Sequence, residues 1–201
     1  MIQNIIFDMG NVLRDFNPMR CILPFAQGED ALLIAQEVFG KAEWRALDRG
    51  DTTYQELAEK CKARLPERLH SRVDQILAHW HEYMPEFPEM AELCRRLKEN
   101  GYHLYLLSNA SVRFDAYKGT FQALKYFDGA IVSAFCHTVK PEEKIYRILF
   151  DTYGLKPAEC FFIDDSAANV EAGRALGMPG HVFTGDKNAL MEDFITYGIK
   201  G

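Results

Sequence analysis

Three carboxylates, a lysine and a hydroxyl stand just downstream of short apolar runs in the chain. Asp8 directly follows one such run, Asp164 and Asp165 follow another, and Ser108 and Lys140 come after two more. Carboxylates that lie close together repel each other, and a hard divalent cation such as Mg²⁺, which prefers oxygen ligands, relieves that repulsion. A lysine and a hydroxyl suit a phosphate group. This set of residue types therefore predicts phosphoryl transfer, with a carboxylate able to act as nucleophile.

The apolar runs themselves predict the strands that position these side chains. Continuous apolar runs are typical of strands covered on both faces, and helical patterns alternate with the later runs, which predicts a mostly parallel α/β sheet. If the chain order reverses at the first strand, the first and fourth strands are neighbours and the carboxylates meet at the switch point. The predicted strands cover residues 5–7, 103–107, 130–132, 161–163 and 181–183.

Helix signals lie between the later strands. Apolar residues over 90–97 share one helix face, and Asn100-Gly101 ends that helix. A second helix is predicted after Pro141, which suits a first turn. A third is predicted from Ser166, as its N-cap, to a stop at Gly177.

The long stretch between the first two predicted strands contains no strand signal. It predicts helices over 30–39, 53–65 and 69–83, the second of which starts with a capping box of Thr53 and Glu56. An insertion after the first strand overhangs the edge where α/β sheets bind ligands. The expected organisation is a doubly wound, Rossmann-like core (residues 1–15 and 86–201) with a small helical cap (residues 16–85).

Composition narrows the class of protein. The 201 residues are 48% apolar and carry a formal charge of −6, the balance of an ordinary globular protein. Without a basic block, a nucleic-acid partner is not expected, and no apolar run reaches the roughly 18 residues of a membrane span. The N-terminus has no basic leader, which predicts a cytoplasmic protein. The expected partner is a small phosphorylated molecule, and the oligomeric state is left open.

Four motifs carry a family resemblance. FDMGNVL, LLSN, VKP and FIDDS, in this order and on these strands, resemble the four motifs of the haloacid dehalogenase superfamily of hydrolases, and the insertion resembles that superfamily's cap. The resemblance implies that Asp8 attacks phosphorus to form an aspartyl-phosphate, and that Ser108 and Lys140 hold the phosphoryl oxygens. It implies that Asp165, helped by Asp164, holds Mg²⁺ together with the Asp8 carboxylate and the Gly10 carbonyl. Asn11 and Asn109, from the same motifs, are predicted to bind substrate beside Ser108 and Lys140.

The first motif departs from the family pattern at one position. Family phosphatases carry a second aspartate where this chain has Gly10, and they use it to protonate the leaving group and later activate water. Such general acid–base help is typically worth about 10²–10⁴-fold. The Asp-x-Gly-Asn pattern resembles a bacterial subgroup that includes an α-D-glucose-1-phosphate phosphatase. Asp15 is a candidate substitute acid, although it could equally cap a helix starting at Pro18.

Two further parts of the sequence allow more than one interpretation. Trp44, Arg45, Asp48 and Arg49 precede Gly50 in the cap, where they suit recognition of a sugar. Alternatively, the tryptophan packs the cap and the charges are solvated. Asn169 could orient a carboxylate, hold the catalytic lysine or face water.

The function predicted is a Mg²⁺-dependent phosphatase of small phosphorylated metabolites, with sugar phosphates favoured. One alternative is a haloacid dehalogenase, in which the aspartate attacks carbon. That reaction needs no metal, so the acidic pair Asp164-Asp165 favours the phosphatase. The other alternative, motivated by Gly10, is a catalytically weak module that binds a phosphorylated ligand or a partner protein.

Overall fold

A parallel sheet of five strands forms the centre of the computed structural model, which describes residues 1–201. The strands are β1 (Asn4–Phe7), β2 (His103–Ser108), β3 (Gly129–Val132), β4 (Cys160–Asp164) and β5 (Gly180–Val182). Their order is β3-β2-β1-β4-β5, and every neighbouring pair is parallel. The predicted reversal at β1 is therefore present, and the α/β doubly wound fold class is confirmed.

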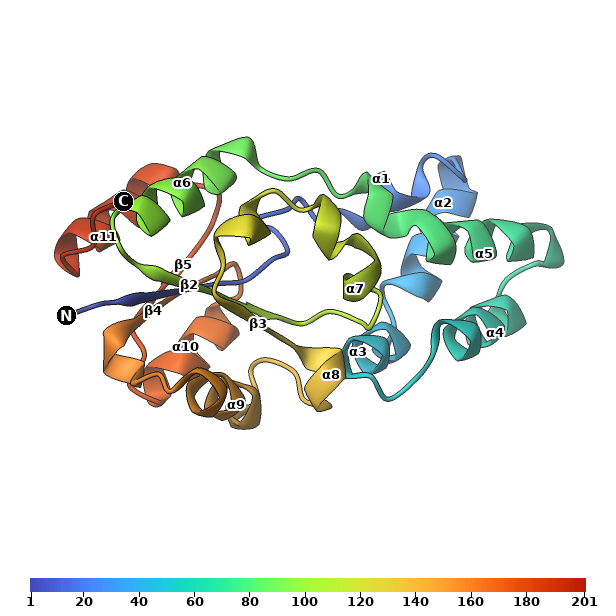
Figure 1. The fold of residues 1–201 in the computed structure, drawn as a ribbon. Coiled ribbons are helices and arrows are strands. Elements are labelled where there is room, and N and C mark those ends of the chain that lie inside the picture. The colour runs from blue at the N-terminus through green and yellow to red at the C-terminus, as the bar shows by residue number, and fades with distance from the viewer.

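The buried strands pack against helices on both faces of the sheet, as Figure 1 shows. Successive side chains of a strand point to opposite faces, so Ile5 and Phe7 join one apolar cluster and Ile6 joins another. This double coverage is the reason that β1 is apolar without alternation. The first cluster includes side chains of α6 (Pro88–Glu99) and α11 (Lys187–Thr196), and the second includes side chains of α9 (Glu143–Tyr153) and α10 (Ala167–Ala175).

The helices between β1 and α6 gather beyond one end of the sheet (Figure 1). They are α1 (Pro18–Ile22), α2 (Gly28–Val38), α3 (Ala42–Arg49), α4 (Tyr54–Arg64), η1 (Glu67–Leu69), α5 (His70–His79) and η2 (Trp80–Tyr83), the η segments being 3₁₀ helices. The sequence predicted α2 and α4, suggested a helix starting at Pro18 that matches the start of α1, and merged the last three, but it did not predict α3. We call this group the cap helices; its status as a separate domain over residues 16–85 stays a prediction.

The remaining helical segments are short connections around the sheet. They are α7 (Phe114–Tyr117), η3 (Lys118–Thr120), η4 (Ala123–Tyr126), α8 (Ser133–Cys136) and η5 (Pro157–Glu159).

None of the helices in the structure combines the length and the apolar character needed to cross a membrane.

The starts of the helices were predicted with mixed success. Thr53 and the glutamate three residues later form the predicted capping box of α4. Asn17 caps α1, because its side-chain oxygen accepts hydrogen bonds from two N–H groups of the first turn, so the suggested cap at Asp15 is wrong. Pro141 precedes α9 instead of starting it. Ser166 occupies the N-cap position of α10, but its side chain makes no capping hydrogen bond.

Candidate active site

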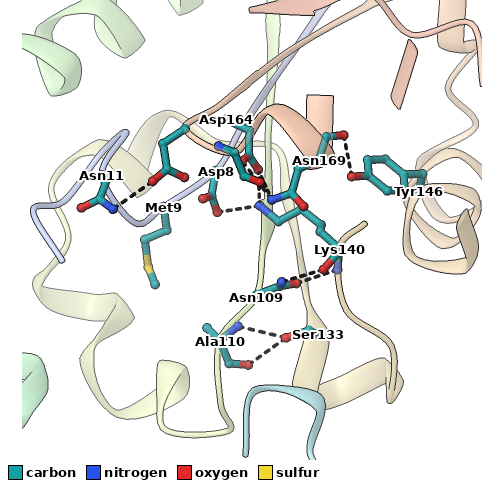
Figure 2. A network of polar contacts seen from close by, with 12 residues as sticks. Asp8, Met9, Asn11, Asn109, Ala110, Ser133, Lys140, Tyr146, Asp164 and Asn169 are labelled. Atoms are coloured by element: carbon teal, nitrogen blue, oxygen red, sulfur yellow. Dashed lines mark hydrogen bonds and ion pairs between the residues drawn. The ribbon is translucent and has the colours of Figure 1, made fainter. Parts of the chain in front are cut away.

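A buried lysine lies between two carboxylates at the carboxyl ends of β1 and β4 (Figure 2). The Nζ atom of Lys140 is 2.7 Å from Asp8 Oδ1 and 2.6 Å from Asp164 Oδ2. The side chains of Lys140 and Asp164 are 1% and 0% exposed, so water does not screen these pairs. Because β1 and β4 are neighbours in the sheet, two residues more than 150 positions apart share one ammonium group.

Burial and neighbouring charges have opposite effects on the pKa values of Asp8 and Lys140. Burial raises the pKa of Asp8 to about 7, although the ammonium of Lys140 opposes that rise. Burial by itself would lower the pKa of Lys140, but the carboxylates of Asp8 and Asp164 outweigh it and the pKa lies above its usual value. Lys140 is therefore held as a cation next to the candidate nucleophile.

Asp164 is fixed by several hydrogen bonds besides its ion pair. The Nδ2 atom of Asn169 donates to Oδ1 and Oδ2 of Asp164 at 2.9 and 3.1 Å, and the backbone N–H of Ser166 donates to Oδ1 at 2.8 Å. Of the readings left open for Asn169, the structure places it on the carboxylate of Asp164. These hydrogen bonds fix the Asp164 carboxylate, which in turn fixes the position of the Lys140 ammonium.

The side chain of Asn109 binds the backbone of the same lysine. Its Nδ2 atom donates to the carbonyl of Lys140 at 3.0 Å, and its Oδ1 atom accepts from the N–H of Lys140 at 2.8 Å. Asn109 also lines the cavity described below. Ser108 ends β2 and is buried, and it does not line that cavity. The substrate-binding roles of Ser108 and Asn109 stay predictions.

An oxygen-rich cluster lies beside the lysine. Asp8, Asp164 and Asp165 each offer a carboxylate oxygen, and these oxygens lie within 4.8 Å of one another. Asp165 is exposed, and the Nδ2 atom of Asn11 donates to its Oδ2 atom at 2.9 Å. The Gly10 carbonyl accepts no backbone or side-chain hydrogen bond and is free to act as a further oxygen ligand. Such an all-oxygen donor set fits Mg²⁺.

The loop after β1 presents these groups through a left-handed turn. Asn11 has φ of +55°, a conformation that asparagine tolerates better than most residues. Its N–H donates to the carbonyl of Arg14 at 2.6 Å, and its Oδ1 atom accepts from the N–H of Phe16 at 3.1 Å. Asn11 therefore shapes the loop and orients Asp165; its predicted contact with substrate stays a prediction.

A cavity of about 240 Å³ opens between this cluster and the cap helices. Trp44 and Asp48, four residues apart on α3, both line it, whereas Arg45 is exposed and Arg49 pairs with Glu142. The predicted recognition segment is thus split between cavity and surface. The cavity is lined by Asp8, Met9, Gly10, Asn11, Phe16, Trp44, Asp48, Trp80, Met84, Asn109, Ala110, Lys140, Asp165 and Asn169.

Three cap-side residues of this cavity were missed by the sequence analysis. Phe16, Trp80 and Met84 carry no motif, and only their place in the fold brings them to the site. The Trp44 ring packs edge-on against Trp80 with centroids 5.2 Å apart, and it stacks on Phe16 at 6.3 Å. The cap side of the cavity is therefore an aromatic wall that faces the charged core side.

The arrangement defines a class of protein, a doubly wound α/β fold with a lysine and carboxylate site between the sheet and the cap helices. The chain matches the model of the haloacid dehalogenase-like hydrolases over residues 2–177 and belongs to that family. The resemblance found in the four motifs is therefore confirmed at the family level, whereas membership of the glucose-1-phosphate subgroup stays a prediction.

Three similar proteins illustrate the range of the family. The chain is 26% identical to a sesquiterpene phosphatase of Aspergillus oryzae, over 93% of this chain and 92% of that one. It is 25% identical to a D-ribitol-5-phosphate phosphatase of Bacteroides thetaiotaomicron, over 88% and 89%. A solved HAD family enzyme of the same bacterium, a mutant in complex with magnesium and inorganic phosphate, has a TM-score of 0.72, 23% identity and coverage of 90% and 93%.

Proposed function

We propose that this chain is a Mg²⁺-dependent phosphatase that hydrolyses small phosphorylated metabolites through an aspartyl-phosphate intermediate. The observation that carries the proposal is the ammonium of Lys140, held between the Asp8 nucleophile and Asp164 beside a cluster of carboxylate oxygens. Relatives that align over most of both chains are phosphatases, which agrees with this chemistry.

The residues divide the chemistry between them. One oxygen of Asp8 attacks phosphorus, while Lys140 offsets the negative charge that accumulates on the phosphoryl oxygens. Asp165, the other Asp8 oxygen and the Gly10 carbonyl would hold Mg²⁺, with Asp164 supporting Lys140. When bound, Mg²⁺ supplies positive charge that attracts the phosphate and offsets the repulsion between the carboxylates. Water then attacks the phosphorus of the intermediate and releases phosphate.

The acidic cluster also separates this proposal from a carbon–halogen hydrolase. Some structurally similar enzymes are dehalogenases, at 18–19% identity, and that level of likeness concerns the fold alone. Displacement of a halide by a carboxylate needs no divalent cation. The exposed Asp165, held by Asn11 next to two other carboxylates, would then have no purpose. The donor set favours phosphoryl transfer.

The cavity limits the substrate class. A volume of about 240 Å³ lies below the 300–1,000 Å³ of a drug-sized site, so a compact phosphate monoester fits best. Trp44 and Trp80 offer flat apolar surfaces for the carbon face of a sugar or sugar alcohol. Sugar phosphates therefore remain our favoured substrates, and the Asp-x-Gly-Asn motif makes sugar 1-phosphates the first candidates.

The test measures phosphate release from an aryl phosphate and from a panel of sugar 1-phosphates, sugar 6-phosphates, sugar-alcohol phosphates and a prenyl phosphate, with and without Mg²⁺. We expect Mg²⁺-dependent release, fastest with the sugar esters that fit the cavity. Release from no ester at any Mg²⁺ concentration would overturn the phosphatase proposal. Fastest release from the prenyl ester would overturn the sugar preference alone.

The nucleophile is tested with Asp8→Asn, because an amide cannot attack phosphorus. Enzymes accelerate reactions by about 10⁶-fold or more, so we expect the turnover to fall by more than about 10³-fold with little change in folding. Acid quenching of the wild type should trap phosphate on the protein, and the variant should trap none. Substantial turnover by Asp8→Asn would contradict the covalent mechanism.

A further inference from the structure

Because residue 10 is a glycine, it provides no acidic side chain to protonate the leaving group from the core side of the site. Attack by Asp8 expels an alkoxide, which is a poor leaving group unless an acid protonates it. Asp15, the candidate from the sequence, does not line the cavity, and its carboxylate pairs with Arg20 at 2.8 Å. Another side chain is needed if the enzyme is to act on alcohol esters.

Asp48 is the carboxyl group that the cap helices contribute to the cavity. Two core carboxylates also line it, but Asp8 is the nucleophile and Asp165 is bonded to Asn11 within the oxygen cluster. The carboxyl of Asp48 forms no hydrogen bond or ion pair with another residue of the chain. A half-buried carboxyl without a partner, on a cap helix and lining the same cavity as Lys140, is free to interact with the substrate.

The backbone around Asp48 is firmly attached to the core. The hydroxyl of Ser133, the first residue of α8, donates to the Asp48 carbonyl. Gly50 ends α3 in a left-handed conformation, so close to Ala134 that a Cβ atom there would lie 2.5 Å from the Ala134 carbonyl oxygen. Arg49 pairs with Glu142 just before α9. Asp48 is therefore held by contacts with the core at its own carbonyl and at the two residues that follow it.

The surroundings of Asp48 favour its neutral, proton-carrying form. Burial raises the pKa of Asp48 well above its usual value, and the negative charge of Asp8 adds to that rise. Asp48 also stands in the last turn of α3, where the partial negative charge of a helix end disfavours a carboxylate. A raised pKa makes a carboxyl group better able to hold a proton and donate it as an acid.

We propose that Asp48 is the general acid and base of this enzyme, replacing from the cap the acid that Gly10 does not provide. The proposal rests on the phosphatase function. In the first step, an Asp8 oxygen forms a bond to phosphorus, the bond from phosphorus to the ester oxygen breaks, and that oxygen takes the Asp48 proton to leave as an alcohol. In the second step, the Asp48 carboxylate takes a proton from water as the water oxygen bonds to phosphorus and the Asp8–phosphorus bond breaks.

The test compares Asp48→Asn with the wild type on two esters. One is an aryl phosphate, whose phenol leaves without help, and the other is the alkyl phosphate that the wild type hydrolyses best. We expect the single-turnover rate of phosphorylation to fall about 10²–10⁴-fold on the alkyl ester and to change little on the aryl ester. Phosphate should also accumulate on Asp8 with the aryl ester, because water lacks its base. Asp51→Asn, the same change on an exposed residue beyond α3, is the matched control.

A second variant separates a chemical role from a structural one. A Cβ atom at Gly10 would meet only the Phe16 Cβ atom, at 3.7 Å, and the backbone there is not left-handed, so Gly10→Asp can be accommodated. Adding Gly10→Asp to Asp48→Asn should restore much of the lost rate on the alkyl ester. Equal losses on both esters, a change in KM alone, or no rescue by Gly10→Asp would overturn the role of Asp48. An inactive wild type would instead overturn the phosphatase function itself.

Discussion

At the scale of single residues, the site depends on one ammonium group that two carboxylates share. Asp8, the proposed nucleophile, is paired with Lys140 alone, whereas Asp164 is also held by Asn169 and a backbone N–H. Replacing Lys140 would leave both carboxylates without their partner, and an uncompensated buried charge typically costs about 3–5 kcal/mol. The rigid support of Asp164 thus fixes the position of the lysine.

Asp165 offers a separate test of the predicted metal site, because it is exposed and does not contact Lys140. We expect Asp165→Ala to fold normally and to need at least about 10–100-fold more Mg²⁺ for half-maximal activity. Loss of a residue that only hydrogen-bonds to a metal ligand already weakens metal binding by about this factor, and Asp165 is proposed to be a ligand itself. Titration of activity against Mg²⁺ concentration measures this, with Asp151→Ala, an exposed aspartate on α9, as control. An unchanged Mg²⁺ requirement would refute the assignment.

At the scale of elements, α3 connects the cap helices to the core. Its C-terminal end touches α8 through Gly50 and reaches the residue before α9 through Arg49. The helix has no side-chain N-cap and buries only Trp44 and Leu47, so little of its stability is local. Contacts with the core therefore decide where its cavity-facing side chains lie.

Gly50→Ala should displace α3, because the added methyl meets the Ala134 carbonyl and φ is +81°. Gly101→Ala is the matched control: φ is +88°, but no atom lies within 4 Å of the added carbon. The left-handed backbone costs about 1–2 kcal/mol in both variants. We expect Gly50→Ala to lose more stability than this and to lose activity as well. Equal losses in denaturant unfolding, with activity kept, would show that the contact with Ala134 is unimportant.

The Arg49–Glu142 pair predicts a specific dependence of stability on pH. The hydrogen bonds from Arg49 lower the pKa of Glu142 from 4.5 to about 2. A lowered pKa in the folded protein means that the stabilisation is present above about pH 4.5 and is lost as the pH falls toward 2. Both side chains are about a third exposed, so the effect is about 1 kcal/mol or less. Glu142→Gln should remove this part of the acid dependence of unfolding, whereas Glu143→Gln should retain it.

At the scale of the whole molecule, the cap helices and the sheet share one apolar core. A cluster of 41 buried residues runs from Ile5 and Phe7 of β1 to Ile34 of α2 and Leu57 of α4. A continuous apolar cluster across the two parts favours a single cooperative unfolding transition. The cap helices are thus expected to stabilise the core as well as cover the site.

Ile34→Ala tests this cooperation far from the chemistry. Ile34 is fully buried in the cap helices, so we expect the free energy of unfolding to fall by about 2–5 kcal/mol. One transition should be seen by both circular dichroism and loss of activity. Leu32→Ala on the same helix, where the side chain is 61% exposed, should change stability by about 0.5 kcal/mol or less. Loss of activity well before loss of secondary structure would contradict the shared core.

The sheet and the residues at its carboxyl edge could be predicted from the sequence alone. Strands such as β1 and β4 are recognisable because burial on both faces requires an unbroken apolar run. Asp8 directly follows β1 and Asp164 ends β4, so both must lie at one edge of the sheet. The capping box at Thr53 is equally local. In each case the signal lies within a few residues of the feature that it predicts.

The cap side of the site was decided by the tertiary structure. The sequence singled out Asp48 for recognition of a sugar but offered Asp15 as the substitute acid, and α3 itself was not predicted. Which face of a short helix meets the cavity depends on contacts with residues far along the chain, such as Ser133, and no periodicity records those contacts. The sequence therefore determined that Asp8, the proposed nucleophile, and Lys140 lie at one edge of the sheet, while long-range packing determined which carboxyl of the cap helices lines the cavity.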